Sequence, residues 1–374
     1  MNRTASRCTV TLLAVATAAA ATAIGAPAAD AQQVLVIDTA AGRVIIDDEW
    51  RAIRTFGDMA LDRTRAILYA RDDEEPEAVM AFSLETGEWI RTIPTPTGDG
   101  PRELQQGMAG MMLGRDGRLY VAGYVRVLEF DPLGQYVSNW RPGVETVRGV
   151  CEFDGQPAVV AYSGVIRRRP DGTDERFGPG FVDRGRTTVE ETPDGLVTRT
   201  SRSPPRIACT ADAAYVVTDS EEGPDSVFVH HRDGRLESWA VPGELAEAFD
   251  DDCKLAVNQS GVSFELPCSV WPRYRRPSLD CRGDLVLLGH DVEVPGAIID
   301  PETGCYAVVR KPERTFAYDA LNIYRDSVLV FRNVAWENDQ SFKLSTAANR
   351  VSLHPLRRVS GAPCPGMLPA AGDG

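Results

Sequence analysis

A short run of arginine and aromatic residues, W-P-R-Y-R-R-P at 271–277, is the most distinctive candidate for chemistry in the chain. It stands out because the chain as a whole is acidic, with a formal net charge of −14 at pH 7. Guanidinium groups beside aromatic rings suit an acidic or aromatic ligand, or the centre of a protein interface. Trp271, Arg273, Tyr274 and Arg275 are therefore candidate binding residues. The alternative is that the rings fix the loop to the fold while the arginines pair with local acids.

Acidic residues gather in four other short segments, at 72–77, 219–225, 290–293 and 336–339. Carboxylates can hold a hard cation such as Ca²⁺ when several of them converge on one point. Calcium or another divalent ion is therefore an alternative, but the spacing identifies no cofactor and no metal ligand. Solvated acids that aid solubility are the simpler interpretation. Two of these segments contain His290 and Trp336, which join the candidate binding residues.

The strongest local signatures of an active site are absent from the sequence. H-E-x-x-H, G-x-S-x-G, a Walker loop, C-x-x-C and an EF-hand loop are all absent. We therefore name no catalytic residue and expect binding rather than catalysis. A metal on a central axis stays open as the alternative, because ligands contributed singly by separate strands would leave no local motif.

The first 31 residues have the pattern of a signal peptide. Arg3 and Arg7 precede an apolar run, and Ala29-Asp30-Ala31 is typical of a cleavage site. We expect cleavage before Gln32 and a periplasmic or secreted protein, with an uncleaved anchor as the competing interpretation. No later segment approaches the roughly 20 apolar residues of a spanning helix, so no membrane insertion is expected after cleavage. The acidic charge disfavours nucleic acid as a partner.

Seven cysteines follow the signal segment, and several should pair in an oxidising compartment. Cys253 and Cys268 flank a hairpin-like segment and are the predicted disulfide. Cys151, Cys209 and Cys281 each stand three residues before an aspartate, at corresponding strand ends. We expect these three to be buried and too far apart to pair, since a disulfide needs Cα atoms within about 7 Å of each other.

The elements that must position these residues are repeated pairs of short strands. The clearest copy, at 114–141, has an Asp-Gly turn, an alternating strand, a bend, a second strand, a Pro-x-Gly turn and a third strand. The second and third strands of this copy form a hairpin at 127–137. Similar hairpins recur at 34–46, 79–93, 165–177, 227–239 and 297–309, and more weakly at 342–353. Pairs of a second kind precede six of them, at 58–70, 111–123, 149–162, 207–218, 278–289 and 320–331.

Four strands per unit and six units predict an all-β fold, a six-bladed β-propeller of four-stranded antiparallel blades. The first hairpin, at 34–46, has no partner unit of its own. We expect it to pair with the last blade and close the ring, because otherwise a strand edge would be exposed. Seven blades are the alternative, with extra strands from 186–200 or 253–266. The domain is predicted to span 32–358, followed by a flexible tail at 359–374.

The strand order assigns the loops to two faces. The lower face carries two turns of each blade, the one between the first and second strands and the one between the third and fourth strands. The upper face carries the bend between the second and third strands and the connection to the next blade. The acidic segments and the long connections at 178–205 and 242–277 all belong to the upper face. We therefore expect a binding site on the upper face.

The segment Gly98-Asp99-Gly100-Pro101-Arg102-Glu103-Leu104 resembles the G-x-G-P-G-E-F element of exported bacterial six-bladed β-propellers related to NHL-repeat and TolB-like proteins. The D-G-x-L-Y-V and F-D-x-x-G elements that follow are similar to the same family. Arg102 and Leu104 depart from the family's Gly and Phe. The resemblance is clearest over 58–141 and extends more weakly to about 358. We add Arg102 and Glu103 to the candidate binding residues.

These observations predict an exported propeller, expected to be a monomer, that binds a protein or small-molecule ligand on its upper face or serves as a scaffold. The alternative is a metal-dependent hydrolase or lyase with a divalent ion on the propeller axis, as in propellers that resemble gluconolactonases or NHL-type lyases.

Overall fold

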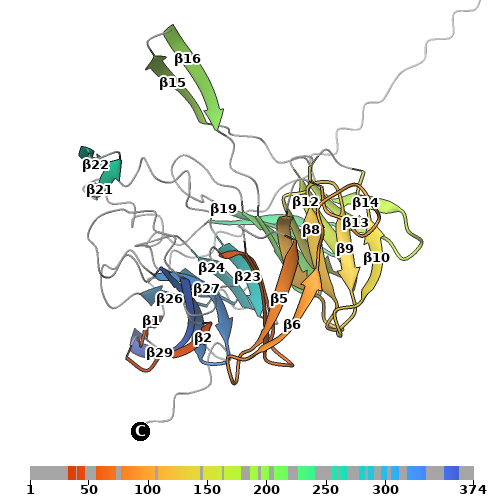
Figure 1. Cartoon of the computed structure of the whole chain (residues 1–374), viewed down its shortest axis with the longest axis horizontal. Coiled ribbons are helices and arrows are strands. Elements are labelled where there is room, and N and C mark those ends of the chain that lie inside the picture. Colours follow the sequence, from red (N-terminus) through yellow and green to blue (C-terminus); the bar gives the residue numbers. More distant parts are fainter. Residues whose placement is uncertain are drawn as a thin grey trace, which may run out of the picture.

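The structure of the chain is a computed structural model. It describes residues 33–38, 40–46, 56–72, 77–105, 108–143, 146–161, 164–177, 186–192, 195–201, 206–217, 226–240, 254–259, 262–267, 278–282, 285–289, 296–300, 305–310, 318–333 and 349–361. The regular elements within these ranges are all β-strands (Figure 1). In this part of the chain there is no helix with the length and apolar character needed to cross a membrane. The predicted signal peptide lies outside the described residues.

The first sheet shows how turn chemistry produces the repeat. It pairs β3 (Phe56–Asp62), β4 (Ile67–Asp72), β5 (Ala78–Ser83) and β6 (Trp89–Pro94) in order, each antiparallel to the next. Asp62 ends β3, and its Oδ1 accepts hydrogen bonds from the backbone N–H groups of Thr64 and Arg65, at 3.1 and 2.9 Å, which closes the first turn. Gly87 lies in the turn between β5 and β6 with a φ of 78°, a conformation that a residue without a Cβ adopts at little cost.

Three further sheets repeat this order along the chain. The second contains β7 (Met108–Leu113), β8 (Leu119–Gly123), β9 (Val127–Phe130) and β10 (Tyr136–Trp140). The third contains β11 (Gly149–Phe153), β12 (Gln156–Ala161), β13 (Gly164–Arg168) and β14 (Asp174–Phe177). The fourth contains β17 (Arg206–Cys209), β18 (Ala213–Val217), β19 (Ser226–His231) and β20 (Leu236–Ala240). The predicted four-stranded antiparallel unit is therefore confirmed in these parts of the chain.

The remaining sheet brings the two ends of the chain together. Its path runs through β23 (Ser278–Arg282), β24 (Leu285–Gly289), β25 (Gly296–Ile299), β26 (Tyr306–Arg310), β1 (Gln33–Ile37), β29 (Asn349–Gly361), β28 (Ser327–Asn333) and β27 (Tyr318–Tyr324). A further strand, β2 (Arg43–Ile46), pairs with β29 as well. Both N-terminal strands therefore join the last strand of the chain.

This pairing corrects the hairpin expected at 34–46. In the strand ladders of the described residues, β1 and β2 pair with β29 instead of with each other. The physical reason is the length of β29, whose 13 residues offer backbone hydrogen bonds to several partners. Its first half pairs with β28 and β2, and its second half pairs with β1, which also lies parallel to β26.

Two long connections form small hairpins of their own. β15 (Arg186–Thr192) pairs with β16 (Gly195–Ser201), and β21 (Lys254–Gln259) pairs with β22 (Val262–Pro267). Each is a separate two-stranded sheet, and both stand apart from the large sheets in Figure 1. In the described pairings, neither hairpin contributes a strand to a larger sheet.

The core lies between neighbouring sheets. The first strands of successive sheets contact one another in the order β3, β7, β11, β17, β23 and β27. Separate apolar clusters join the first sheet to the second, the second to the third, and the third to the fourth. Another cluster joins Leu68 and Phe82 of the first sheet to Leu329 of β28 and Val351 of β29. The first and last parts of the chain thus share one core.

Candidate functional site

Side-chain contacts tie the loops of the first two sheets together at two opposite faces. On the upper face, Arg126 in the bend between β8 and β9 contacts the connection between β6 and β7. On the lower face, Arg65 in the turn after β3 donates a hydrogen bond from Nη1 to the carbonyl of Pro132, at 3.2 Å. Each contact joins two loops that the strand order assigns to the same face.

Arg126 organises the segment that carries the family resemblance. Its guanidinium is 2% exposed and donates to the backbone carbonyls of Asp99, Gly100 and Glu103. The contacts to Glu103 and Asp99 measure 2.7 and 3.0 Å. Three carbonyl dipoles therefore face one buried cation, and the loop is held in a single shape without a carboxylate partner for the arginine.

Glu103, a predicted binding residue, turns its carboxylate into this loop. Its Oε2 accepts a hydrogen bond of 2.7 Å from the backbone N–H of Gly100. A Cβ at Gly98, where φ is 155°, would overlap the same Oε2, so the glycine leaves room for the carboxylate. This contact gives Glu103 a role in holding the loop, and the binding role predicted for it stays a prediction.

Arg102 is exposed, and its guanidinium carbon lies 4.8 Å from the centre of the Tyr136 ring. The Tyr136 hydroxyl donates to the carbonyl of Pro101 at 3.0 Å. Leu104 is buried in the cluster between the first two sheets. Arg102 and Leu104, which replace the Gly and Phe of the family element, therefore lie on the surface and in the core respectively.

Arg71 is a third arginine near this face, at the end of β4. It is 6% exposed, and its Nε has no hydrogen-bond partner. Its guanidinium forms no ion pair with any residue in the described part of the chain. A buried cation without a counter-ion is unfavourable in a folded protein, so this position calls for an explanation.

The arginines of the lower face are arranged differently, because several meet carboxylates. The ion pairs there include Arg118 with Asp116 and Glu129, Arg167 with Asp154 and Glu175, Arg169 with Glu175, and Arg232 with Asp154. The contact of Arg232 with Asp154, at 2.9 Å, joins the fourth sheet to the third. Hydrogen bonds from Arg167 and Arg169 hold the pKa of Glu175 at about 2.

A second group of polar residues lies between the second and third sheets on the lower face. Glu152 accepts a hydrogen bond from the backbone N–H of Arg115 at 3.1 Å, and burial raises the pKa of its carboxyl group above the ordinary value. Burial also raises the pKa of Tyr120, with a further contribution from Glu129. Among the described residues, no three His, Cys, Asp or Glu side chains form a group that could hold a metal ion.

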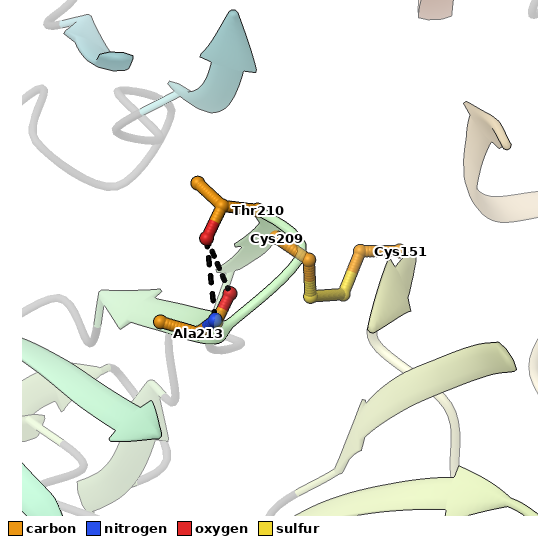
Figure 2. The surroundings of a disulfide bond; sticks show 4 residues. All are labelled: Cys151, Cys209, Thr210 and Ala213. Carbon is orange, nitrogen blue, oxygen red and sulfur yellow. Dashed lines mark hydrogen bonds between the residues drawn. A yellow bond between two sulfur atoms is a disulfide. The ribbon is translucent and has the colours of Figure 1, made fainter. Parts of the chain in front are cut away.

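The structure overturns one expectation about the cysteines. Cys151 and Cys209 form a disulfide between β11 and β17, with Cα atoms 5.7 Å apart (Figure 2). These strands belong to neighbouring sheets, but first strands are where such sheets approach most closely, as the near contact of Gly110 and Gly149 on β7 and β11 shows. Cys305 is also disulfide-bonded. Cys151 is buried, as predicted, whereas Cys209 is half-buried.

Most of the other predicted site residues lie outside the described residues. These are Trp271, Arg273, Tyr274, Arg275, His290 and Trp336, together with Cys253 and Cys268. The same holds for most residues of the four acidic segments. The site that the structure brings together is therefore the one around Arg126 and the Gly98–Leu104 loop.

Sequence reasoning missed Arg71 and Arg126. The signal for Arg71 was present, because it occupies an alternating position after Ile67 and Tyr69 where the strand pattern calls for an apolar side chain. Arg126 gave no comparable signal. Its burial depends on a loop that is 22 to 28 residues earlier in the sequence.

The comparisons with known proteins concern the fold. No family model matches the chain, and no curated protein matches it. It is similar in structure to a protein of Bacteroides fragilis described as exported, with a TM-score of 0.53 and 10% identity over 89% of this chain and 97% of that one.

Two enzymes are also similar. A streptogramin B lyase has a TM-score of 0.47 and 10% identity over 88% of this chain and 100% of the lyase. A gluconolactonase of Xanthomonas campestris has a TM-score of 0.46 and 12% identity over 84% of this chain and 89% of the enzyme. At such identities a likeness to solved structures concerns the fold alone, and the all-β fold of four-stranded antiparallel sheets is of the propeller type.

Proposed function

We propose that the chain is an exported, six-bladed β-propeller whose ring is closed by β1 and β2. The pairing of both strands with β29 supports this proposal, as does the core shared by the first sheet with β28 and β29. The succession of contacts from β3 to β27 has the order expected of strands around a central axis. Export is supported by the signal-peptide pattern of the first 31 residues.

We further propose that the propeller is a binding module with its ligand or protein partner on the upper face. One observation carries this proposal: among the described residues, the upper-face arginines of the first two sheets face carbonyls, a ring or no partner, whereas lower-face arginines of the second, third and fourth sheets face carboxylates. Cations without an acidic partner among the described residues make the potential around the Gly98–Leu104 loop more positive than the net charge of the chain alone would. A more positive potential favours an acidic ligand or an acidic region of a partner.

A pair of matched variants tests the location. The upper-face variant combines Arg102→Ala, Arg273→Ala and Tyr274→Ala. The lower-face variant combines Arg169→Ala with Arg235→Ala, since Arg235 lies in the turn between β19 and β20 and pairs with Glu237. Wild type and both variants are compared by pull-down from an extract of the exported fraction and by thermal shift against a library of small acids. Loss of binding in the upper-face variant alone supports the proposal. Equal binding by all three proteins contradicts it.

Elemental analysis of the purified protein tests the alternative function. A stoichiometric divalent ion whose removal by a chelator lowers the melting temperature would favour a metal-dependent hydrolase or lyase. The same sample, assayed before and after chelation, serves as its own control.

A further inference from the structure

The side chain of Arg71 faces the boundary between the first two sheets. On β4, Ile67 and Tyr69 belong to the cluster shared with the second sheet, whereas Leu68 and Ala70 belong to the cluster on the opposite side. Successive side chains of a strand alternate between its faces, so Arg71 continues the series of Ile67 and Tyr69. It lies at the upper end of β4, beyond the apolar part of that boundary.

Arg71 is buried, and its guanidinium has no counter-charge in the described part of the chain. Its Nε has no hydrogen-bond partner, and no hydrogen bond or ion pair joins it to any other residue for which the structure gives a position. Arg126, on the same face, offsets its burial with three backbone carbonyls. Arg71 has no such arrangement. Within the described residues nothing completes its hydrogen bonds, and the 6% of its surface that remains exposed gives access to a group from solution.

The neighbouring charges select the kind of group. Arg126 and Arg141 both contact the carbonyl of Asp99 in the loop that also contains Arg102, and Arg71 lies near the end of β4 on the same face. None of the four forms an ion pair within the described ranges. The nearest polar contact of Arg141 is the carbonyl of Asp99, at 3.4 Å. These arginines favour an anion next to them, although the chain carries a net charge of −14.

We propose that Arg71 anchors the carboxylate group of a small organic acid on the upper face, between the first two sheets. This inference rests on the proposed binding function and names its ligand class. A guanidinium presents two parallel N–H groups that match the two oxygens of a carboxylate. A single unpaired buried arginine balances one negative charge, which suits a carboxylate better than a phosphate dianion in an acidic protein.

Thermal unfolding of the mature protein in the presence of acetate, succinate and benzoate tests the ligand class. Sodium chloride at equal ionic strength is the reference, and sodium phosphate is the competing anion. At least one carboxylate should raise the melting temperature saturably where chloride does not. A saturable effect of phosphate without any effect of the carboxylates would overturn the ligand class, and no saturable effect of any anion would overturn the site.

Three variants test the residue. Arg71→Met should weaken carboxylate binding by roughly 10- to 100-fold, the loss expected for a charged hydrogen-bonded pair. Arg71→Lys keeps the charge but not the paired N–H groups and should bind with intermediate affinity. Arg169→Met, which removes an arginine of the lower face, should bind as wild type.

The unliganded variants separate binding from folding. Because Arg71 has no partner to lose, Arg71→Met without ligand should melt at the same temperature as wild type or higher. A marked fall in its melting temperature, or full retention of carboxylate binding, would overturn the proposal. If no carboxylate raises the melting temperature, but the variant Arg102→Ala, Arg273→Ala, Tyr274→Ala still loses binding to its partner, the proposed ligand class is wrong and the proposed binding function stands.

Discussion

At the scale of single residues, the surroundings of a buried arginine indicate whether it holds a loop in place or is a candidate for binding. Arg126 and Arg71 have similar burial, 2% and 6% exposed, but opposite surroundings. Arg126 is surrounded by carbonyls of the Gly98–Leu104 loop and so acts as a structural residue. Arg71 has no comparable partners and is the better candidate for binding.

Replacing Arg126 should loosen the Gly98–Leu104 loop. Arg126→Met leaves three backbone carbonyls without their donor, and we expect a loss of about 1–3 kcal/mol in the free energy of unfolding. Hydrogen exchange at the amides of Gly98, Glu103 and Leu104 should accelerate. Arg141→Met removes only the 3.4 Å contact with Asp99 and is the matched control. Equal exchange in both variants would contradict the structural role of Arg126.

Glu152 should make stability depend on pH. Its pKa is raised in the folded state by burial, so the folded protein binds more protons than the unfolded chain at pH values just above the ordinary pKa of a glutamate. The free energy of unfolding therefore falls as pH rises through that window. Glu152→Gln removes this penalty, and its stability relative to wild type should be greater at pH 7 than at pH 4.

Urea denaturation at pH 4, 5.5 and 7 measures this difference. Glu77→Gln, at an exposed position, controls for the loss of one negative charge. A constant difference between Glu152→Gln and wild type at all three pH values would show that burial of Glu152 does not penalise its ionised form.

At the scale of elements, the strands and most turns follow from local sequence, but their cross-links do not. Gly87 and Gly134 have positive φ in the turns that follow β5 and β9, a conformation that tight turns of this kind require. The disulfide of Cys151 and Cys209 depends instead on how closely β11 and β17 approach, which no local pattern encodes.

This disulfide should stabilise the boundary between the third and fourth sheets. It closes a loop with a sequence separation of 58 residues, and such cross-links contribute roughly 2–4 kcal/mol. The double variant Cys151→Ala, Cys209→Ala should lose stability of this order in chemical denaturation. Reduced wild type should resemble the variant in this region, and an unchanged denaturation midpoint in the variant would contradict the prediction.

The hairpin of β21 and β22 offers a second cysteine test. Lys254 is the register partner of Pro267, and the predicted disulfide partners Cys253 and Cys268 directly flank this pair in the sequence. We expect peptide mass mapping without reduction to recover them as one linked species. Alkylation of Cys253 in the unreduced protein would contradict the pairing.

At the scale of the whole molecule, the ends of the chain are the decisive elements. Leu35, Ile37, Ile45 and Ile46 of β1 and β2 are buried in clusters that include residues of β28 and β29. His354 of β29 lies against Gly42, where a Cβ would overlap its ring, and its Nδ1 is 3.1 Å from the carbonyl oxygen of Asp38. The N-terminal strands are therefore part of the core.

Deleting residues 33–46 should consequently unfold the protein. Four buried apolar side chains contribute roughly 6–12 kcal/mol, which is comparable to the total stability of a typical domain. Circular dichroism and size-exclusion chromatography should show loss of the cooperative transition, and a synthetic peptide of residues 33–46 should restore it. Deletion of 362–374, which follow β29, is the control. A truncated protein with the wild-type transition would contradict closure by β1 and β2.

The sequence by itself determined the four-stranded repeat, the positions of its turns and the division of its loops between two faces. These features are local, because alternating apolar residues and turn-forming glycines act within a few positions of each other. Tertiary structure alone decided the partners of β1 and β2, the disulfide between β11 and β17, and the burial of Arg71 with no counter-ion among the residues that the structure describes. Each of these depends on how closely segments far apart in the chain approach one another, and local patterns carry no measure of that distance.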